Sequence, residues 1–222
     1  MGIHAHTLEL IGGEVCLAFT DTVDWRKSDH PQELLASYSD LVSWSQDVGI
    51  LTGEDAERLL QQAKCRQPEA GAVFERAIAL RETIYRIFTA IADGQPLAPD
   101  DLEMLNDALS EASARLRVVP TMEGFAWDWA NRDEALDQML WQIVRLAAGL
   151  LTSEKLDRVK QCPGCGWLFL DQSRNRSRRW CTMKVCGNRA KSHRHYERKK
   201  RQRVTDQPVS AAGITTISNG QE

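Results

Sequence analysis

The sequence predicts a mainly α-helical protein that contains one short β-hairpin and ends in a small module organised by cysteines. Three observations support this fold class. Apolar side chains recur at helical spacing through most of residues 1–154, apolar and other residues alternate over 116–129, and four of the six cysteines fall within 162–186. A chain of 222 residues can form one medium-sized domain and a small one, so we expect two domains.

Proline, glycine and capping residues divide the first domain into helices. Pro68 and Pro99 suit the first turn of a helix, where no backbone N–H partner is needed. Thr52 suits an N-cap, and Gly49 and Gly94 suit helix ends. The predicted helices cover residues 31–48, 53–66, 68–93, 99–109 and 133–151.

Between the last two of these helices, the apolar period changes. Phe125, Trp127 and Trp129 alternate with smaller or polar residues after a turn at 120–124, which predicts a short β-hairpin. Trp127 and Trp129 either form one buried face of this hairpin or line a ligand-binding pocket. Both interpretations stay open, because indole rings suit an apolar core and an apolar pocket equally well.

Four isolated residues of the first domain are interpreted as core. Trp44 and Trp141 fall on predicted helices, where a large aromatic side chain is usually buried. Cys16 and Cys65 have no other cysteine nearby in the sequence. They are predicted to be ordinary buried thiols.

Charge divides the chain into two unlike parts. Residues 155–203 hold 16 Lys and Arg against three acidic residues, a net of +13, whereas residues 1–154 hold 12 against 26, a net of −14. The overall charge of −3 conceals this difference. A compact segment with such a positive charge can neutralise phosphates, so nucleic acid is the expected partner of 155–203. Residues 204–222 are poor in charge and rich in Ser, Thr and Gly, and they predict a disordered tail.

The four clustered cysteines have the spacing of a structural zinc site. Cys162 and Cys165 form a C-x2-C pair, and Cys181 and Cys186 form a C-x4-C pair fifteen residues later. Four thiolates fill the tetrahedral shell of one Zn(II) and leave no position for a reactive water. A redox dithiol is the alternative, but no stretch of the sequence reads as a signal peptide or a membrane span, which predicts a cytoplasmic protein with reduced thiols. His193 and His195 lie close enough in sequence to replace a ligand, yet we expect them to be solvated or to face phosphate.

The path of the chain through this module predicts a treble-clef-like finger. A short strand leads into the first cysteine pair, a second strand leaves it, and a helix over 189–203 follows the last cysteine. Trp167, Phe169 and Trp180 are interpreted as the small core of the finger, with stacking on unpaired bases as the alternative. The predicted phosphate-binding residues lie on the helix and on the segment that returns to it: Arg174, Arg176, Arg178, Arg179, Arg189, Lys191, Arg194 and Arg198.

The residues from Cys162-Pro-Gly-Cys165 to Cys186-Gly-Asn-Arg189 resemble the CGNR-type zinc finger. In that family the finger follows an N-terminal helical domain called ABATE, and Gly12-Gly-Glu-Val-Cys-Leu-Ala18-Phe-Thr-Asp21-Thr-Val resembles the opening motif of that domain. Ala18 and Asp21 stand where the family pattern has the Asp of Leu-Asp-Phe and the Asn of Asn-Thr, so any ligand role of those two residues is not carried over to this chain. The resemblance implies a stress-induced bacterial transcription regulator whose finger binds DNA.

These observations predict a regulator that binds duplex DNA through a structural zinc finger. Its N-terminal domain is expected to sense a small-molecule effector or to form a homodimer. An RNA-binding or protein-binding zinc module is the alternative function. Catalytic activity is not expected, because the sequence contains no Gly-rich phosphate loop and no recognisable grouping of a nucleophile with a base.

Overall fold

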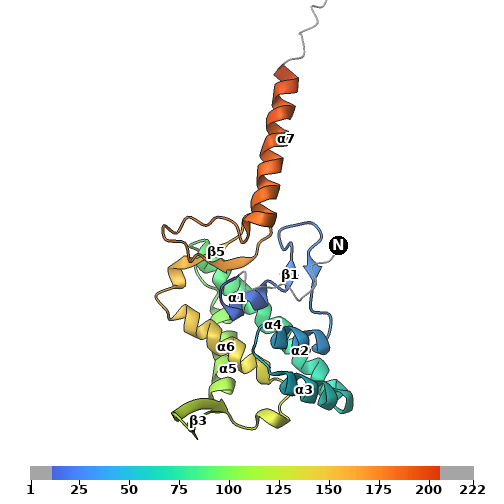
Figure 1. The fold of residues 1–222 in the computed structure, drawn as a ribbon, viewed down its shortest axis with the longest axis vertical. Coiled ribbons are helices and arrows are strands. Elements are labelled where there is room, and N and C mark those ends of the chain that lie inside the picture. The colour runs from blue at the N-terminus through green and yellow to red at the C-terminus, as the bar shows by residue number, and fades with distance from the viewer. Residues whose placement is uncertain (1–11, 206–222) are drawn as a thin grey trace, which may run out of the picture.

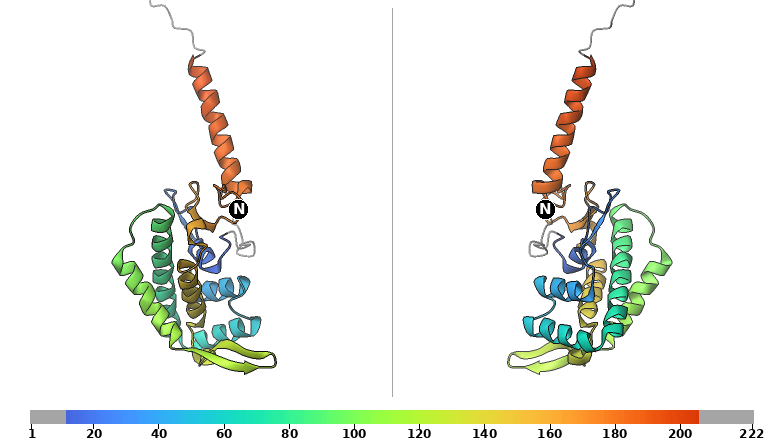
Figure 2. Two further views of the ribbon diagram at one scale, coloured as in Figure 1. Left: turned by 90° about the vertical axis from the view of Figure 1, so that its left-hand side faces the viewer. Right: turned by 90° about the vertical axis from the view of Figure 1, so that its right-hand side faces the viewer.

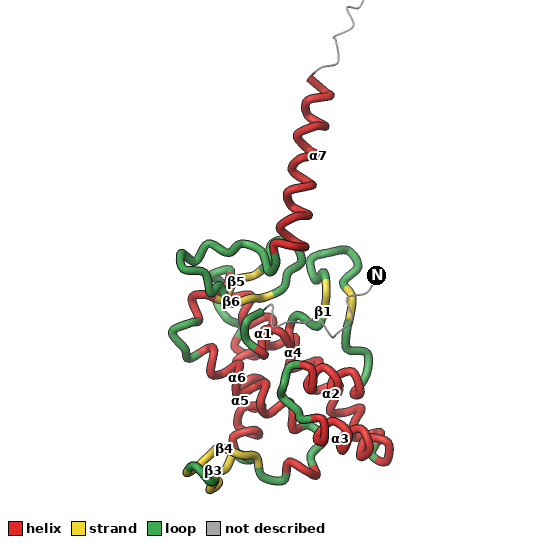
Figure 3. Tube along the Cα trace, in the orientation of Figure 1, coloured by secondary structure: helices red, strands yellow, loops and turns green. Residues whose placement is uncertain are grey.

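The computed structural model describes residues 12–205. Residues 12–154 form a helical body, and residues 155–205 form a small finger whose last helix projects outward (Figure 1). No helix within these residues is long and apolar enough to cross a membrane. The α-helices are α1 Val15–Thr20, α2 Tyr38–Asp47, α3 Gly53–Cys65, α4 Gln67–Ala92, α5 Pro99–Ser113, α6 Gln138–Leu151 and α7 Asn188–Thr205. The strands are β1 Val23–Asp24, β2 Gln32–Glu33, β3 Leu116–Thr121, β4 Gly124–Trp129, β5 Val159–Gln161 and β6 Leu168–Leu170. They form three separate antiparallel pairs (Figure 3), so the mainly α fold class is confirmed.

The core of the body lies between α1, α4 and α6. The six-residue helix α1 is central, and its residues from Cys16 to Thr20 are buried against α4 and α6. Phe19 packs against Trp44 of α2 with ring centroids 5.2 Å apart, and α5 covers the other side of α4 and α6. Burial of these apolar side chains is the main stabilising contribution to the body.

Several helix boundaries follow the capping signals of the sequence. Thr52 forms the predicted N-cap as part of a capping box with Asp55, and Pro99 begins α5. Two helices begin later in the sequence than predicted: α2 begins at Tyr38 and α6 at Gln138. The segment after Pro31 contains strand β2 before Ser37 caps α2, and a 3₁₀ turn at Arg132–Glu134 precedes α6. The first segment pairs with β1 and contacts α4 through the ion pair of Glu33 with Arg81, and the second accepts a hydrogen bond from Gln62 of α3 at the Asp133 carbonyl. These tertiary contacts override the local apolar spacing.

The β1–β2 pair is held to α4 by two ion pairs, and the arginine of one of them is buried. Arg81 is almost fully buried and donates two hydrogen bonds of 2.6 Å to the carboxylate of Glu33. Burial alone would lower the pKa of this guanidinium, but the hydrogen bonds and the charge of Glu33 raise it. Arg26 pairs with Glu82 in the same way, at 2.8 Å. These ion pairs fix the loop between β1 and β2 on the body.

The β3–β4 hairpin forms as predicted, but its outer half is not buried. Trp129 packs on Trp141 with ring centroids 5.7 Å apart, whereas Trp127 is 61% exposed and Phe125 is 80% exposed. Figure 2 shows the hairpin at the end of the molecule opposite α7. The prediction of one buried hairpin face is therefore wrong for Trp127, because only the base of the hairpin reaches the helices.

The other isolated predictions have mixed outcomes. Trp44, Trp141 and Cys16 are buried, as expected. Cys65 is exposed, contrary to the prediction, because it is the last residue of α3 and lies beside the turn into α4. The predicted tail 204–222 lies outside the described residues except for Val204 and Thr205, which continue α7 rather than beginning a disordered tail.

Candidate metal centre and nucleic-acid interface

The four predicted zinc ligands come together in the finger. The sulfur atoms of Cys162, Cys165, Cys181 and Cys186 all lie within 4.8 Å of one another, and all four residues are buried. The Sγ atoms of Cys165 and Cys181 are 3.5 Å apart, and those of Cys181 and Cys186 are 3.6 Å apart. A tetrahedral zinc ion with Zn–S distances of ~2.3 Å requires sulfur atoms ~3.8 Å apart. The cluster therefore fits one zinc ion and leaves it no open coordination position.

The first cysteine pair is shaped by a tight turn. Gly166 N–H donates to the Cys162 carbonyl at 2.9 Å, and Cys162 N–H donates to the Trp167 carbonyl at 2.8 Å. Gly166 has a φ of +85°, which favours glycine, and a Cβ there would lie 3.1 Å from Lys27 and 3.2 Å from Arg26. The turn that presents the two sulfurs is thus also a close contact with the helical body.

Zinc binds the thiolate form of cysteine, so metal binding at this cluster would release the protons of its thiols. His193 and His195 lie on exposed positions of α7 and are not part of the sulfur cluster.

Asp171 organises the rest of the finger. Its side chain is fully buried and accepts hydrogen bonds from Lys160 Nζ at 2.6 Å, from Ser173 N–H at 2.9 Å and from Arg178 N–H at 3.0 Å. Burial alone would raise the pKa of this carboxyl, but the hydrogen bonds from Lys160 and Ser173 hold it well below its usual range. One buried carboxylate thus joins the strand before the first cysteine pair to the loop before the second.

The aromatic residues of the finger form its core. Trp167 and Phe169 are buried against the cysteines, and Trp180 packs on the same cluster. Trp167 Nε1 also donates to the Val23 carbonyl of the body at 3.0 Å. These contacts confirm the interpretation of the three rings as core.

Strand β6 belongs to two cores. Phe169 faces the cysteine cluster, whereas Leu168 and Leu170 are part of the core of the helical body. Side chains alternate across a strand, so three consecutive residues serve both sides. The finger is therefore built onto the body and is not a module on a flexible linker.

Asp21 of the body makes a hydrogen bond to strand β6 at the junction of body and finger. Its Oδ1 accepts the backbone N–H of Leu168 at 2.9 Å, while its Oδ2 is buried and has no hydrogen-bond partner among the described residues. Burial strongly raises the pKa of the carboxyl. Asp21, one of the two positions at which this chain departs from the family pattern, thus makes a structural contact to the finger, a role that sequence reasoning missed.

Two further contacts connect body and finger. Tyr85 on α4 donates to the Gly166 carbonyl at 3.1 Å, and Gln161 on β5 donates to Tyr85 at 3.0 Å and to Thr89 at 3.1 Å. No local sequence signal marks these residues as partners, because they lie more than 70 positions apart.

Helix α7 begins directly at the metal cluster and leaves the body. Cys186 lies in a π-helical turn, Met183–Gly187, that continues into α7. The views in Figures 1 and 2 show the helix extending outward from the finger. Arg189 at its start stacks over the Trp25 ring at 4.4 Å, so the β1–β2 loop supports the base of the helix. Lys191, Arg194 and Arg198 are exposed farther along.

The predicted basic strip before α7 is only partly available. Arg174 and Arg179 are exposed, and Arg176 is half-exposed and paired with Asp157. Arg178 has a different role. It donates to the carbonyls of Trp180 and Cys181 and lies over the Phe169 ring at 4.6 Å, so its guanidinium holds the finger together. Phosphate binding by Arg178 stays a prediction, and we do not include this residue in the proposed DNA contacts because its guanidinium is engaged within the finger.

Comparison with protein families agrees with this architecture. Residues 13–154 match the ABATE family, described as "putative stress-induced transcription regulator". The chain belongs to the ABATE family. Residues 158–199 match the CGNR zinc finger, and the matched segment contains the four cysteines and the first two-thirds of α7. The ABATE domain corresponds to the helical body, and the CGNR finger corresponds to the metal-binding module. No curated protein matches the chain.

Proposed function

We propose that this ABATE-family protein is a regulator of transcription that binds duplex DNA by placing α7 in the major groove. The observation that carries this proposal is the geometry and charge of α7. The helix has 18 residues, with eight Lys and Arg against the single acid Glu197, and it extends away from an otherwise acidic body. A major groove ~12 Å wide admits an α-helix, and clustered positive charge neutralises the flanking phosphates.

The metal and the body would set the position of this helix. Zinc bound to Cys186 would fix its first turn, and Trp25 would hold Arg189 from the side of the body. Spacings of three and four residues place Lys191, Arg194 and Arg198 on one face of the helix, where we propose phosphate contacts. Arg174, Arg176 and Arg179 would extend the same positive surface along the finger.

The acidic helical domain would regulate rather than bind DNA. Its net charge of −14 repels phosphate, and its direct packing against the finger offers a route by which an effector or a second copy could change DNA binding. This role would place the protein in the cytoplasm, together with the genome that it regulates. We propose no catalytic activity, because a four-thiolate zinc site has no open position for substrate.

An RNA-binding or protein-binding finger is the second candidate. Burial of Trp167 and Phe169 removes two rings that could stack on bases, although Tyr196 on α7 is 65% exposed and remains available. The observations thus favour duplex DNA over single-stranded RNA.

Salt-dependent binding of the zinc-loaded full chain tests the proposal. Anisotropy with genomic duplex fragments, single-stranded RNA and structured RNA should show the tightest binding to duplex DNA. Replacing Arg194 and Arg198 by Ala should reduce the slope of log K against log salt by roughly one unit per lost phosphate contact. The control replaces Arg117 and Arg145, two exposed arginines of the body, and should leave the slope unchanged. Equal slopes in both variants, or preferred binding of RNA, would contradict the proposal.

A further inference from the structure

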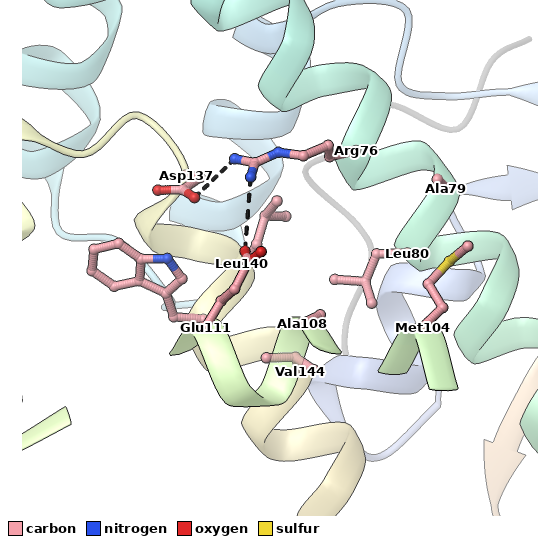
Figure 4. A pocket seen from close by; sticks show the side chains of 10 residues that line it. Arg76, Ala79, Leu80, Met104, Ala108, Glu111, Asp137, Leu140 and Val144 are labelled. Atoms are coloured by element: carbon pink, nitrogen blue, oxygen red, sulfur yellow. Dashed lines mark hydrogen bonds and ion pairs between the residues drawn. The ribbon is translucent and has the colours of Figure 1, made fainter. Parts of the chain in front are cut away.

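The helical body contains an apolar pocket between α4, α5 and α6 (Figure 4). Its volume is about 270 Å³, and most of its lining is aliphatic or aromatic. The apolar walls are Ala79, Leu80, Met104, Ala108, Leu140, Trp141 and Val144. Trp127 and Trp129, the sequence-predicted candidates for a ligand wall, do not line it.

The size of the pocket limits what it can hold. An apolar protein cavity of ~150 Å³ binds benzene, so about 270 Å³ accommodates a body of roughly two fused rings or a short branched chain. The small side chains of Ala79 and Ala108 leave this space open. The seven apolar wall residues offer no polar side-chain group, so the main part of the ligand must be apolar.

Three charged side chains complete the lining and select the polar group of the ligand. Arg76 contacts Asp137 at 2.9 Å and Glu111 at 3.9 Å, as the dashed lines in Figure 4 show. Among the residues that line the pocket, one cation thus faces two carboxylates, and Arg115 places a second guanidinium outside the lining, over the Trp141 ring at 4.7 Å. Within residues 12–205, the Glu111 carboxylate has only this distant ion pair, and its side chain is 70% exposed. An added ammonium group would pair with the weakly paired Glu111, whereas an added carboxylate would lie beside Glu111 and Asp137 and be repelled by both.

We propose that this pocket is an effector site for a hydrophobic amine. The apolar body of the ligand lies between Leu80, Ala108 and Val144, and its protonated amino group pairs with Glu111 beside Asp137. This assignment gives the helical domain a ligand class and a place to bind it.

The pocket and the finger share helix α4, which links the proposed site to regulation. Arg76 and Leu80 line the pocket, and Tyr85 and Thr89, about one to three turns farther along the same helix, hydrogen-bond to the finger. A ligand that shifts α4 against α6 also shifts the support of the finger. This second step rests on the proposed DNA-binding function, whereas binding of the amine does not.

Calorimetry on the zinc-loaded full chain at neutral pH tests binding with three matched probes: 1-naphthylmethylammonium, 1-naphthylacetate and 1-naphthylmethanol. We expect one saturable site for the ammonium compound and affinity at least about tenfold weaker for the carboxylate. Ala108→Phe should fill the pocket and abolish binding. Glu111→Gln should weaken ammonium binding by about three- to tenfold and leave the alcohol unchanged, whereas Glu57→Gln, an exposed acid on α3, should change neither.

Each negative result would overturn a different part of the proposal. Absence of saturable binding, equal affinity for ammonium and carboxylate, or unchanged binding in both pocket variants would overturn the effector site. Regulation is tested by duplex anisotropy with and without the ammonium probe, where we expect a shift of about fivefold that disappears in Glu111→Gln. Amine binding without any such shift would overturn the coupling. Loss of duplex binding under all conditions, with amine binding intact, would overturn the proposed DNA-binding function alone.

Discussion

The helical body and the zinc finger are stabilised in different ways, although strand β6 belongs to both. The body buries many large apolar side chains on α1, α2, α4 and α6, and no single one decides its fold. The finger buries two large rings, Trp167 and Phe169, beside four sulfurs and one carboxylate, Asp171. A module this small cannot bury enough apolar surface by itself, so a few polar and metal-binding groups carry its structure. Substitutions should therefore have distributed effects in the body and concentrated effects in the finger.

The largest effect is expected for loss of a metal ligand. Cys181→Ser should remove zinc, whose binding contributes ~10–16 kcal/mol to folding in small zinc-finger peptides. The base of α7 should lose its order, while α1 to α6 persist with reduced stability, because Leu168 and Leu170 also belong to the core of the body. Metal analysis and circular dichroism measure both outcomes. Cys65→Ser, at an exposed cysteine outside the cluster, is the control. One zinc per chain in Cys181→Ser would contradict the four-ligand assignment.

A smaller effect is expected when the carboxylate of the finger is neutralised. Asp171→Asn leaves Lys160 beside an uncharged group and should destabilise the finger by about 3 kcal/mol. The low folded-state pKa of Asp171 means that its contribution is complete above the unfolded pKa and is lost as pH falls toward the folded value. Unfolding in urea at neutral pH should show the full difference. Asp157→Asn, which breaks the exposed pair with Arg176, should cost under about 1 kcal/mol. Equal effects of the two substitutions would contradict the role assigned to Asp171.

The smallest effect is expected at the junction of body and finger. Burial raises the pKa of Asp21, so the folded protein binds this proton more tightly than the unfolded chain does, and stability falls as pH rises until the folded pKa is passed. Asp21→Asn keeps an oxygen for the Leu168 N–H and removes the buried charge. It should stabilise the protein by ~1 kcal/mol at slightly alkaline pH, and less as pH falls. Thermal unfolding between mildly acidic and mildly alkaline pH checks the trend, with exposed Asp29→Asn as the control. A destabilised Asn variant would show that the charge itself holds the junction.

The sequence by itself determined the features that depend on local spacing. The capping box at Thr52, the start of α5 at Pro99 and the β3–β4 hairpin could be predicted because each is decided by a few neighbouring residues. The zinc ligands could be predicted for a related reason. Two short-range cysteine pairs in the finger define a metal site that needs no other side chain of the body.

Only the tertiary structure decided which surroundings each side chain meets. Arg178 binds backbone carbonyls inside the finger, Trp127 remains exposed beyond the base of its hairpin, and Asp21 meets the N–H of Leu168, 147 positions away. The apolar pocket is likewise formed by three helices whose spacing no local pattern specifies. The physical reason is that burial, desolvation and pKa depend on groups brought together by packing. A residue type and its neighbours in sequence determine the local conformation, but they do not determine which distant residues pack against that side chain.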